Sequence, residues 1–191
     1  ETVVETDVDC VRVITYGSHD NIVVVDRPPF APFSVDVCSD MADIQKYSLG
    51  QMKEFADTVS LDKIAFLEEG IAMNRNVAKV GAQLRFGKSL MEMKEHALLD
   101  DSLMSFVPLI TGSASFARMS GVDLPVMTAT GSGNQGITLF LTLDAAAEKL
   151  GCCREKKLRA LALANVVNIY AKSYIGTLSP ICACGIASGL G

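Results

Sequence analysis

Residues 131–136 are the segment whose composition points most directly to chemistry. They read Gly-Ser-Gly-Asn-Gln-Gly and follow the stretch 124–130. Glycine lets a backbone take positive φ and approach a ligand closely, and the amides of Asn134 and Gln135 both donate and accept hydrogen bonds. A helix is predicted over residues 137–150, so the N–H groups of a helix N-terminus would face the same place. This combination suits a carboxylate or a small zwitterion.

The same six residues also fit a purely structural role. A glycine-rich turn between two helices, with Asn134 as the N-cap residue, would have the same composition. A P-loop is excluded, because no Gly-Lys-Ser/Thr follows the segment. We therefore predict a small-molecule site, with the structural turn as the alternative. The candidate binding residues are Gly131, Ser132, Gly133, Asn134, Gln135 and Gly136.

Cys182 and Cys184 form the second segment with chemical potential. Ser179 and Pro180 make a favourable helix start, because proline is tolerated in a first turn, so we expect both cysteines to lie on one helix. Residues two apart on a helix point to nearly opposite sides. This predicts one metal ligand and one packed thiol, with two buried core thiols as the alternative. A zinc ribbon is not expected, since the chain contains no Cys-x-x-Cys pair.

The remaining polar residues identify no general base. Arg118 is a candidate partner for a carboxylate, with a charge on a helix surface as the equal alternative. His19 lies in a predicted turn and is interpreted as a polar turn residue. The chain offers no Ser-His-Asp arrangement and no paired carboxylates.

The composition of the chain limits the kinds of partner and the cellular compartment that we expect. The chain has 191 residues, a net charge of −5, 49% hydrophobic residues and no Trp. The charge argues against a nucleic-acid partner or an anionic membrane surface. No apolar run approaches the roughly 18 residues that span a bilayer, and no signal peptide opens the chain. We therefore expect a cytoplasmic protein whose six cysteines are reduced thiols.

The patterning predicts an α+β fold that is predominantly helical, with a small N-terminal β-containing subdomain. Apolar runs at 8–16 and 21–26 flank a Gly-Ser-His-Asp turn and predict a β-hairpin, and a third strand is expected around 33–38. Helical periodicity is predicted over residues 43–58, 60–84, 88–98, 101–119, 136–150 and 154–175. We place the β-containing subdomain at 1–42 and the helical domain at 43–191. The chain begins with Glu and ends in an apolar stretch, so we expect a domain that is incomplete at its C-terminus.

Six motifs in a fixed order carry a resemblance that covers nearly the whole chain and is strongest from 60 to 191. They are Ser60-Leu-Asp-Lys-Ile-Ala-Phe-Leu-Glu-Glu, Leu98-Leu-Asp-Asp-Ser-Leu, Ala117-Arg-Met-Ser-Gly, Leu124-Pro-Val-Met, Gly131-Ser-Gly-Asn-Gln-Gly-Ile and Leu178-Ser-Pro-Ile-Cys-Ala-Cys. Together they resemble the L-cysteine desulfidase family, which is related to the alpha chain of the iron–sulfur L-serine dehydratases.

The resemblance implies a lyase that performs β-elimination on a small amino acid without pyridoxal phosphate. L-Cysteine would give pyruvate, ammonia and sulfide, and L-serine would give pyruvate and ammonia. The implied cofactor is a [4Fe–4S] cluster held by three cysteines, one iron of which stays open as a Lewis acid. Of these ligands the resemblance implies one in this chain, Cys182, with Cys184 as the alternative.

The other two ligands would belong to a Gly-Cys-Thr-Glu-Pro-like motif and a Cys-Asp-Gly-Ala-Lys-like motif, neither of which occurs in this sequence. We therefore interpret the chain as the central part of a longer enzyme and expect no stable cluster on these 191 residues alone. A non-catalytic ligand-binding or assembly protein that keeps the glycine-rich loop is the alternative function. The choice between cysteine and serine, and between a monomer and a homodimer, stays open.

Overall fold

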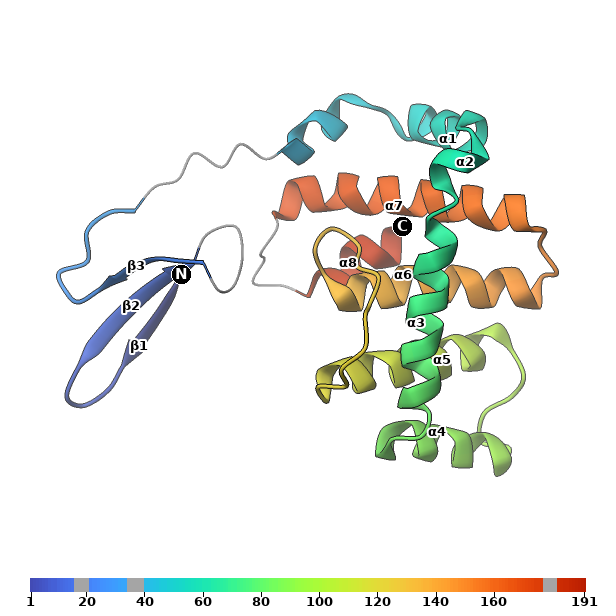
Figure 1. Ribbon diagram of the computed structural model, residues 1–191, viewed down its shortest axis with the longest axis horizontal. Coiled ribbons are helices and arrows are strands. Elements are labelled where there is room, and N and C mark those ends of the chain that lie inside the picture. Colours follow the sequence, from blue (N-terminus) through green and yellow to red (C-terminus); the bar gives the residue numbers. More distant parts are fainter. Residues whose placement is uncertain (16–20, 34–39, 177–181) are drawn as a thin grey trace. The chain divides into compact units, whose positions relative to one another are not determined.

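The computed structural model describes residues 1–15, 21–33, 40–176 and 182–191. The chain divides into two compact units, Glu1–Cys38 and Ser39–Gly191. The first contains a small antiparallel sheet and the second is helical (Figure 1). The predicted α+β class is confirmed.

The N-terminal unit holds three antiparallel strands in the order β1 (Thr2–Glu5), β2 (Cys10–Thr15) and β3 (Ile22–Asp26). The two predicted apolar runs are therefore strands β2 and β3, paired with each other. Arg12 anchors this pair, because its Nε donates to Asp26 Oδ1 at 2.9 Å and its guanidinium lies 4.9 Å from the Phe30 ring centroid. Strand β1 was not predicted, since all four of its residues are exposed and carry no alternating pattern. The predicted turn with His19, and residues 34–38 of the expected third strand, lie outside the described residues.

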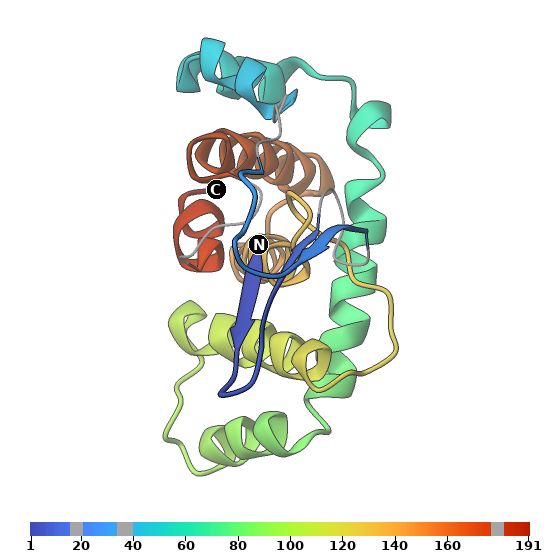
Figure 2. The same ribbon diagram turned by 90° about the vertical axis from the view of Figure 1, so that its left-hand side faces the viewer.

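The helical unit is built from one 3-10 helix and eight α-helices among the described residues. They are η1 (Asp40–Lys46), α1 (Leu49–Thr58), α2 (Leu61–Ile64), α3 (Leu67–Gly81), α4 (Arg85–Glu95), α5 (Leu103–Met119), α6 (Gly133–Lys149), α7 (Arg154–Ile175) and α8 (Ala183–Leu190). Helices α5, α6 and α7 form a layer that α3 crosses, and α8 packs on α6 and α7 (Figure 1). Figure 2 shows α3 and α8 on opposite sides of this layer. No helix within the described ranges is long and apolar enough to cross a membrane.

Several predicted boundaries are wrong for identifiable reasons. The predicted helix at 43–58 is interrupted, because Ser48 starts α1 with a capping box in which Ser48 and Gln51 exchange hydrogen bonds. The predicted helix at 60–84 divides into α2 and α3. The helix predicted at 88–98 begins earlier, at Arg85, and contains Gly87, where a Cβ would come within 2.2 Å of the carbonyl oxygen of Gly81. The glycine is there for close packing rather than for a turn.

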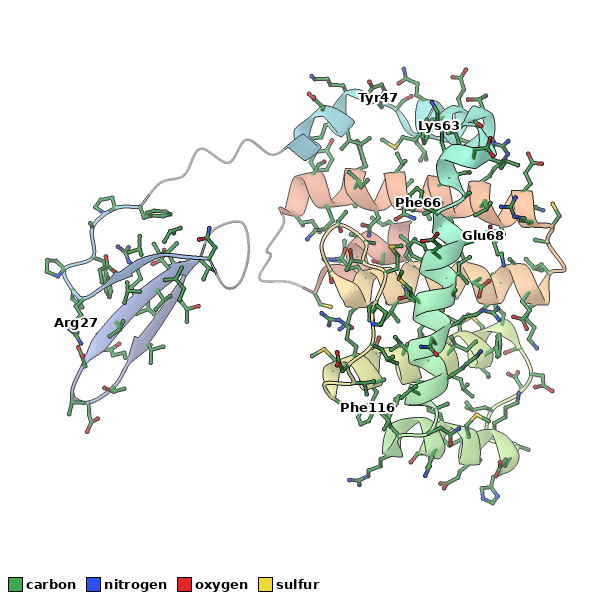
Figure 3. The ribbon with its side chains drawn as sticks, in the orientation of Figure 1. Arg27, Tyr47, Lys63, Phe66, Glu68 and Phe116 are labelled. Atoms are coloured by element: carbon green, nitrogen blue, oxygen red, sulfur yellow. The ribbon has the colours of Figure 1, made fainter. Side chains whose placement is uncertain are left out.

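Two groups of buried side chains hold the helices together. One joins α1, α2, α3, α6 and α7 around Phe140, Leu158 and Leu161, and the other joins α3, α5 and α6 around Val77 and Ile137. Polar contacts reinforce the edges. At the start of α3, Glu68 (Figure 3) accepts two hydrogen bonds from Arg154 of α7, at 2.7 and 2.8 Å. Phe116 of α5, labelled in the same figure, stacks on Phe86 of α4 with ring centroids 5.4 Å apart.

A buried carboxylate ties together three helices of the unit. Asp144 of α6 is 3% exposed and pairs with Arg75 of α3 and, at 2.9 Å, with Lys157 of α7. Arg75 also reaches Glu148 of α6. Because both basic partners are partly exposed, the network costs less desolvation than a fully buried one would. It fixes α6 between α3 and α7.

The crossing of α3 and α5 depends on Gly81. A Cβ at this position would lie 2.0 Å from the main-chain oxygen of Ser113. Replacing Gly81 by Ala should therefore destabilise the protein by about 2–3 kcal/mol, because two helix backbones would have to separate. Gly189→Ala is the matched control, since nothing lies within 4 Å of its added Cβ and alanine favours a helix. Urea unfolding of the two variants measures the difference, and equal stability would show that the crossing tolerates a methyl group.

Candidate functional site

An extended segment leads into the glycine-rich loop and is held by one buried side chain. Asn74 of α3 is fully buried, donates to the Met127 carbonyl oxygen at 3.2 Å and accepts from the Met127 N–H at 3.0 Å. It thus gives this segment the pair of main-chain hydrogen bonds that a neighbouring strand would provide. The first turn of α6 lies against the same segment, because a Cβ on Gly136 would be 2.0 Å from the Met127 oxygen.

The loop itself is a tight turn that runs directly into α6. Thr130 and Gly131 both have positive φ, at 47° and 77°, and Ala129 and Ser132 exchange main-chain hydrogen bonds of 3.1 and 3.0 Å. Ser132 is the N-cap residue and accepts from the N–H of Gln135. Helix α6 therefore begins at Gly133, and the expectations of a helix from about 136 and of Asn134 as N-cap are wrong. The Ser132 hydroxyl takes the capping position because it lies three residues before an N–H that needs an acceptor.

The three glycines of the loop serve different purposes. Only Gly131 uses a positive φ. Gly136 allows the main chain of residues 127–128 to approach, and Gly133 makes room for Arg118, whose Nε would be 2.3 Å from an added Cβ. Their spacing matches that of the dinucleotide-binding motif, but in that motif the glycines follow a strand of a parallel sheet. The only sheet in the described part of the chain is antiparallel and lies in the other unit, so the loop has no such context.

Arg118 lies over the N-terminus of α6. Its Nη1 donates to the Asn134 Oδ1 at 3.3 Å. None of the ion pairs in the described ranges includes Arg118. A guanidinium at the positive end of a helix is electrostatically unfavourable unless an anion is also present. The arrangement therefore suits an anionic group held between Arg118 and the first turn of α6.

Gln135, in contrast, faces the interior. Its side chain is buried and lies within hydrogen-bonding distance of Thr130 and Asn168. Of the two amides that the sequence offered for ligand binding, only that of Asn134 is half exposed beside Arg118. The assignment of residues 131–136 to a ligand stays a prediction, in which Asn134 and the first-turn amides are the groups placed to act.

The two cysteines of the second segment lie at the start of α8. Cys182 is the exposed N-cap residue and Cys184 is half buried in the first turn. The expectation that both lie on the helix and point apart is wrong, because the helix begins at Ala183 and the two thiols contact each other. The proposed start at Ser179 and Pro180 lies outside the described residues. The two thiols differ in their electrostatic surroundings and not in the sides of a helix toward which they point.

The surroundings shift the pKa values of the two thiols in opposite directions. The backbone N–H groups of Cys184 and Gly185, together with the Cys184 thiol, lower the pKa of Cys182. Burial, followed by contact with Cys182, raises the pKa of Cys184, which the charge of Arg118 partly opposes. Cys182 is therefore the better thiolate, the form that binds metals. Arg118 also acts on Cys184, so the ends of α5, α6 and α8 meet at one place.

Three further buried polar residues near this place were missed by the sequence analysis. Lys172, on α7, is 1% exposed. Burial lowers the pKa of its ammonium group, and the neighbouring Cys184 acts in the opposite direction. Lysine in the last turn of a helix is normally a solvated residue that favours the helix C-terminus, so the pattern gave no signal. Asn168 and Ser188 lie beneath the loop. Their burial depends on the packing of α7 and α8 on α6, which the sequence pattern did not reveal.

The described residues fit part of a metal centre. No group of three or more His, Cys, Asp or Glu side chains converges among them. Among the described cysteines, Cys182 offers an exposed thiol with a lowered pKa at a helix N-terminus. The donor set thus fits one cysteine ligand of a cluster that needs three, and Cys184 is close enough to substitute for it.

Comparison with known proteins matches most of the chain to one protein family. The family described as serine dehydratase alpha chain matches residues 34–191. A UPF0597 protein of Clostridium tetani is 36% identical over 94% of this chain and 44% of its own length. A UPF0597 protein of Caldanaerobacter subterraneus is 36% identical over 94% of this chain and 43% of its own length. The chain thus spans less than half of these relatives. No solved structure matches it.

The opposite pKa shifts of the two thiols predict different pH profiles of alkylation. A lowered pKa populates the thiolate at lower pH, so iodoacetamide should modify Cys182 at pH values where Cys184 is still protonated. Mass spectrometry of the metal-free protein resolves the two sites. In a Cys184→Ala variant the Cys182 profile should move only part of the way toward that of an ordinary thiol, since the amide donors remain. Identical profiles for the two cysteines would contradict this assignment.

Proposed function

Because this chain belongs to the serine dehydratase alpha chain family, we propose that it forms part of a lyase that performs β-elimination on a small amino acid. L-Serine and L-cysteine are the two candidate substrates, and the reaction does not need pyridoxal phosphate. The observation that carries the proposal is the position of Arg118. Its guanidinium lies over Gly133 at the N-terminus of α6 and within electrostatic reach of Cys184.

In this proposal the substrate carboxylate binds between Arg118 and the first turn of α6. Arg118 supplies a charge-assisted hydrogen bond. The N–H groups of Gly133 and Asn134 belong to the first turn, where no intrahelical acceptor exists, so they are available to the same carboxylate. The Asn134 side chain, already bonded to Arg118 at 3.3 Å, orients the guanidinium.

The proposed cofactor is a [4Fe–4S] cluster for which Cys182 is one ligand. When bound, such a cluster offers an open iron as a Lewis acid for the leaving group or the carboxylate. Cys182 suits the ligand role because the amides at the start of α8 favour its thiolate. The two remaining ligands that the resemblance implies are not found in this sequence.

Binding without catalysis is the second candidate function. The relatives carry no activity in their names, and carboxylate recognition needs only Arg118 and the start of α6. Release of pyruvate from L-serine or L-cysteine by the iron-loaded full-length protein separates the two candidates. Binding of the amino acid without turnover would favour the non-catalytic role.

A double-mutant cycle tests how Gly133 contributes. Arg118→Ala should weaken L-serine binding about tenfold or more, the usual cost of losing a hydrogen bond to a charged group. Gly133→Ala should weaken binding by displacing the Arg118 side chain, because its Cβ would overlap that side chain rather than a main-chain atom. The double variant should then bind no more than about twofold less tightly than Arg118→Ala alone. Calorimetry measures the constants, with Gly189→Ala as the control.

Additive effects in this cycle would mean that Gly133 contacts the ligand directly. Unchanged binding in Arg118→Ala would remove the carboxylate site from the proposal altogether.

A second test concerns the cluster ligand. In the full-length protein Cys182→Ser should abolish the visible absorbance of the reconstituted cluster, because one of three thiolates is lost. Cys184→Ala should leave most of the absorbance in place. Iron analysis accompanies each spectrum, and the reverse result would transfer the ligand role to Cys184.

A further inference from the structure

Four polar side chains meet beneath the glycine-rich loop and form what we name the Asn168 cluster. They are Thr130 of the loop, Gln135 of α6, Asn168 of α7 and Ser188 of α8. The side chains come from three helices and a turn that pack on one another. Asn168, at 0% exposure, is fully buried, and Gln135 and Ser188 are 3% and 7% exposed.

Asn168 stands at the centre of the cluster. Its Nδ2 donates to Gln135 Oε1 at 3.3 Å and to Ser188 Oγ at 3.2 Å. Its Oδ1 accepts from the Thr130 hydroxyl at 3.0 Å. The Ser188 hydroxyl in turn donates to the Gln135 main-chain oxygen at 3.3 Å. One side chain therefore connects the loop, the first turn of α6 and helix α8.

The cluster has a cost that an apolar contact would not have. Burying polar groups is unfavourable unless nearly all of their hydrogen bonds are made. Thr130 adds to the cost, because a β-branched residue with a φ of 47° is strained. Its hydroxyl lies 3.1 Å from Gln135 and 3.0 Å from Asn168, so the strained turn and the cluster stabilise each other. Few alternative arrangements of the loop and α8 would satisfy all of these groups.

We propose that Asn168 is a positioning residue that holds the glycine-rich loop in register with helix α8, which it contacts through Ser188. This inference rests on the proposed function for its consequence. In the proposed function the loop binds the substrate, and Cys182, the N-cap residue of α8, is the metal ligand. Asn168 therefore sets the position of a bound amino acid relative to that ligand. It does so without touching either of them.

Three variants of the full-length protein distinguish the hydrogen bonds that join the cluster to the loop from those that join it to α8. Asn168→Ala removes every bond of the central side chain. Ser188→Ala removes the two bonds that join α8 to the cluster, one from Asn168 and one to the Gln135 main-chain oxygen, and leaves the bond between Asn168 and Thr130 in place. Asn165→Ala is the matched control. Asn165 lies on the same helix, one turn earlier, and donates to the Leu161 carbonyl oxygen of its own helix, at 2.9 Å.

Amide hydrogen exchange of the metal-free and ligand-free protein is the first measurement. Asn168→Ala should speed exchange about tenfold in both 130–136 and 183–190, since a lost buried hydrogen bond lowers the local opening free energy. Ser188→Ala should speed exchange in 183–190 and leave 130–136 within about twofold of the unmodified protein. Asn165→Ala should change neither segment. A general loss of stability would not produce this asymmetry.

Turnover per bound iron is the second measurement. Because the loop keeps its other contacts in Ser188→Ala, the KM for the amino acid should change less than about twofold while kcat falls about tenfold. Normalising to bound iron prevents unfolded or metal-free protein from imitating the effect.

The outcomes of the two measurements distinguish a failure of the positioning role from a failure of the proposed function. Exchange in Asn168→Ala within twofold of the unmodified protein, or an equal change in Asn165→Ala, would overturn the positioning role whatever the turnover. The predicted exchange pattern in a protein that turns over neither amino acid would support the positioning role and overturn the proposed function. An unchanged kcat in an active Ser188→Ala enzyme would show that the alignment does not matter for turnover and would also overturn the inference.

Discussion

The main-chain contact at Gly136 is the constraint on which the candidate site depends. The oxygen of Met127 occupies the space that any side-chain carbon at position 136 would need, and Asn74 holds Met127 there from the other side. This contact determines where α6 can begin. The turn at 130–131, the cap at Ser132 and the place for Arg118 all follow from that starting point.

Positive electrostatic groups gather around this starting point. The N-termini of α6 and α8 carry partial positive charge. Arg118 acts to lower the pKa of Cys184, and Cys184 in turn acts to raise the pKa of the buried Lys172 against the effect of burial. This local concentration of positive charge contrasts with the net charge of −5 of the chain. It is consistent with a place where anionic groups, thiolate or carboxylate, are stabilised, as the proposed lyase requires.

The features that were predicted correctly from the sequence are those that depend on the local spacing of apolar residues. The period of α7, the runs of β2 and β3 and the α+β class all follow from spacing of apolar residues, and the family resemblance followed from ordered motifs. The packing contacts of Gly133 and Gly136 were not predicted, because a glycine that makes room for a neighbouring side chain or main chain looks the same in sequence as one that makes a turn. Asn168 and Lys172 gave no signal for a related reason. The loop and α8 contact Asn168, and the apolar pattern of α7 by itself does not show that Asn168 and Lys172 are buried.

The exposed position of Arg118 has a consequence for selectivity. A guanidinium above a helix N-terminus attracts small anions of many kinds, so phosphate or sulfate in solution would compete for the same place. In the proposed site, recognition of the carboxylate would not distinguish an amino acid from other acids, and it would not distinguish serine from cysteine. Discrimination has to come from the groups that meet the ammonium and the β-substituent, so any enzyme built on this site reads its substrate at the end farthest from Arg118.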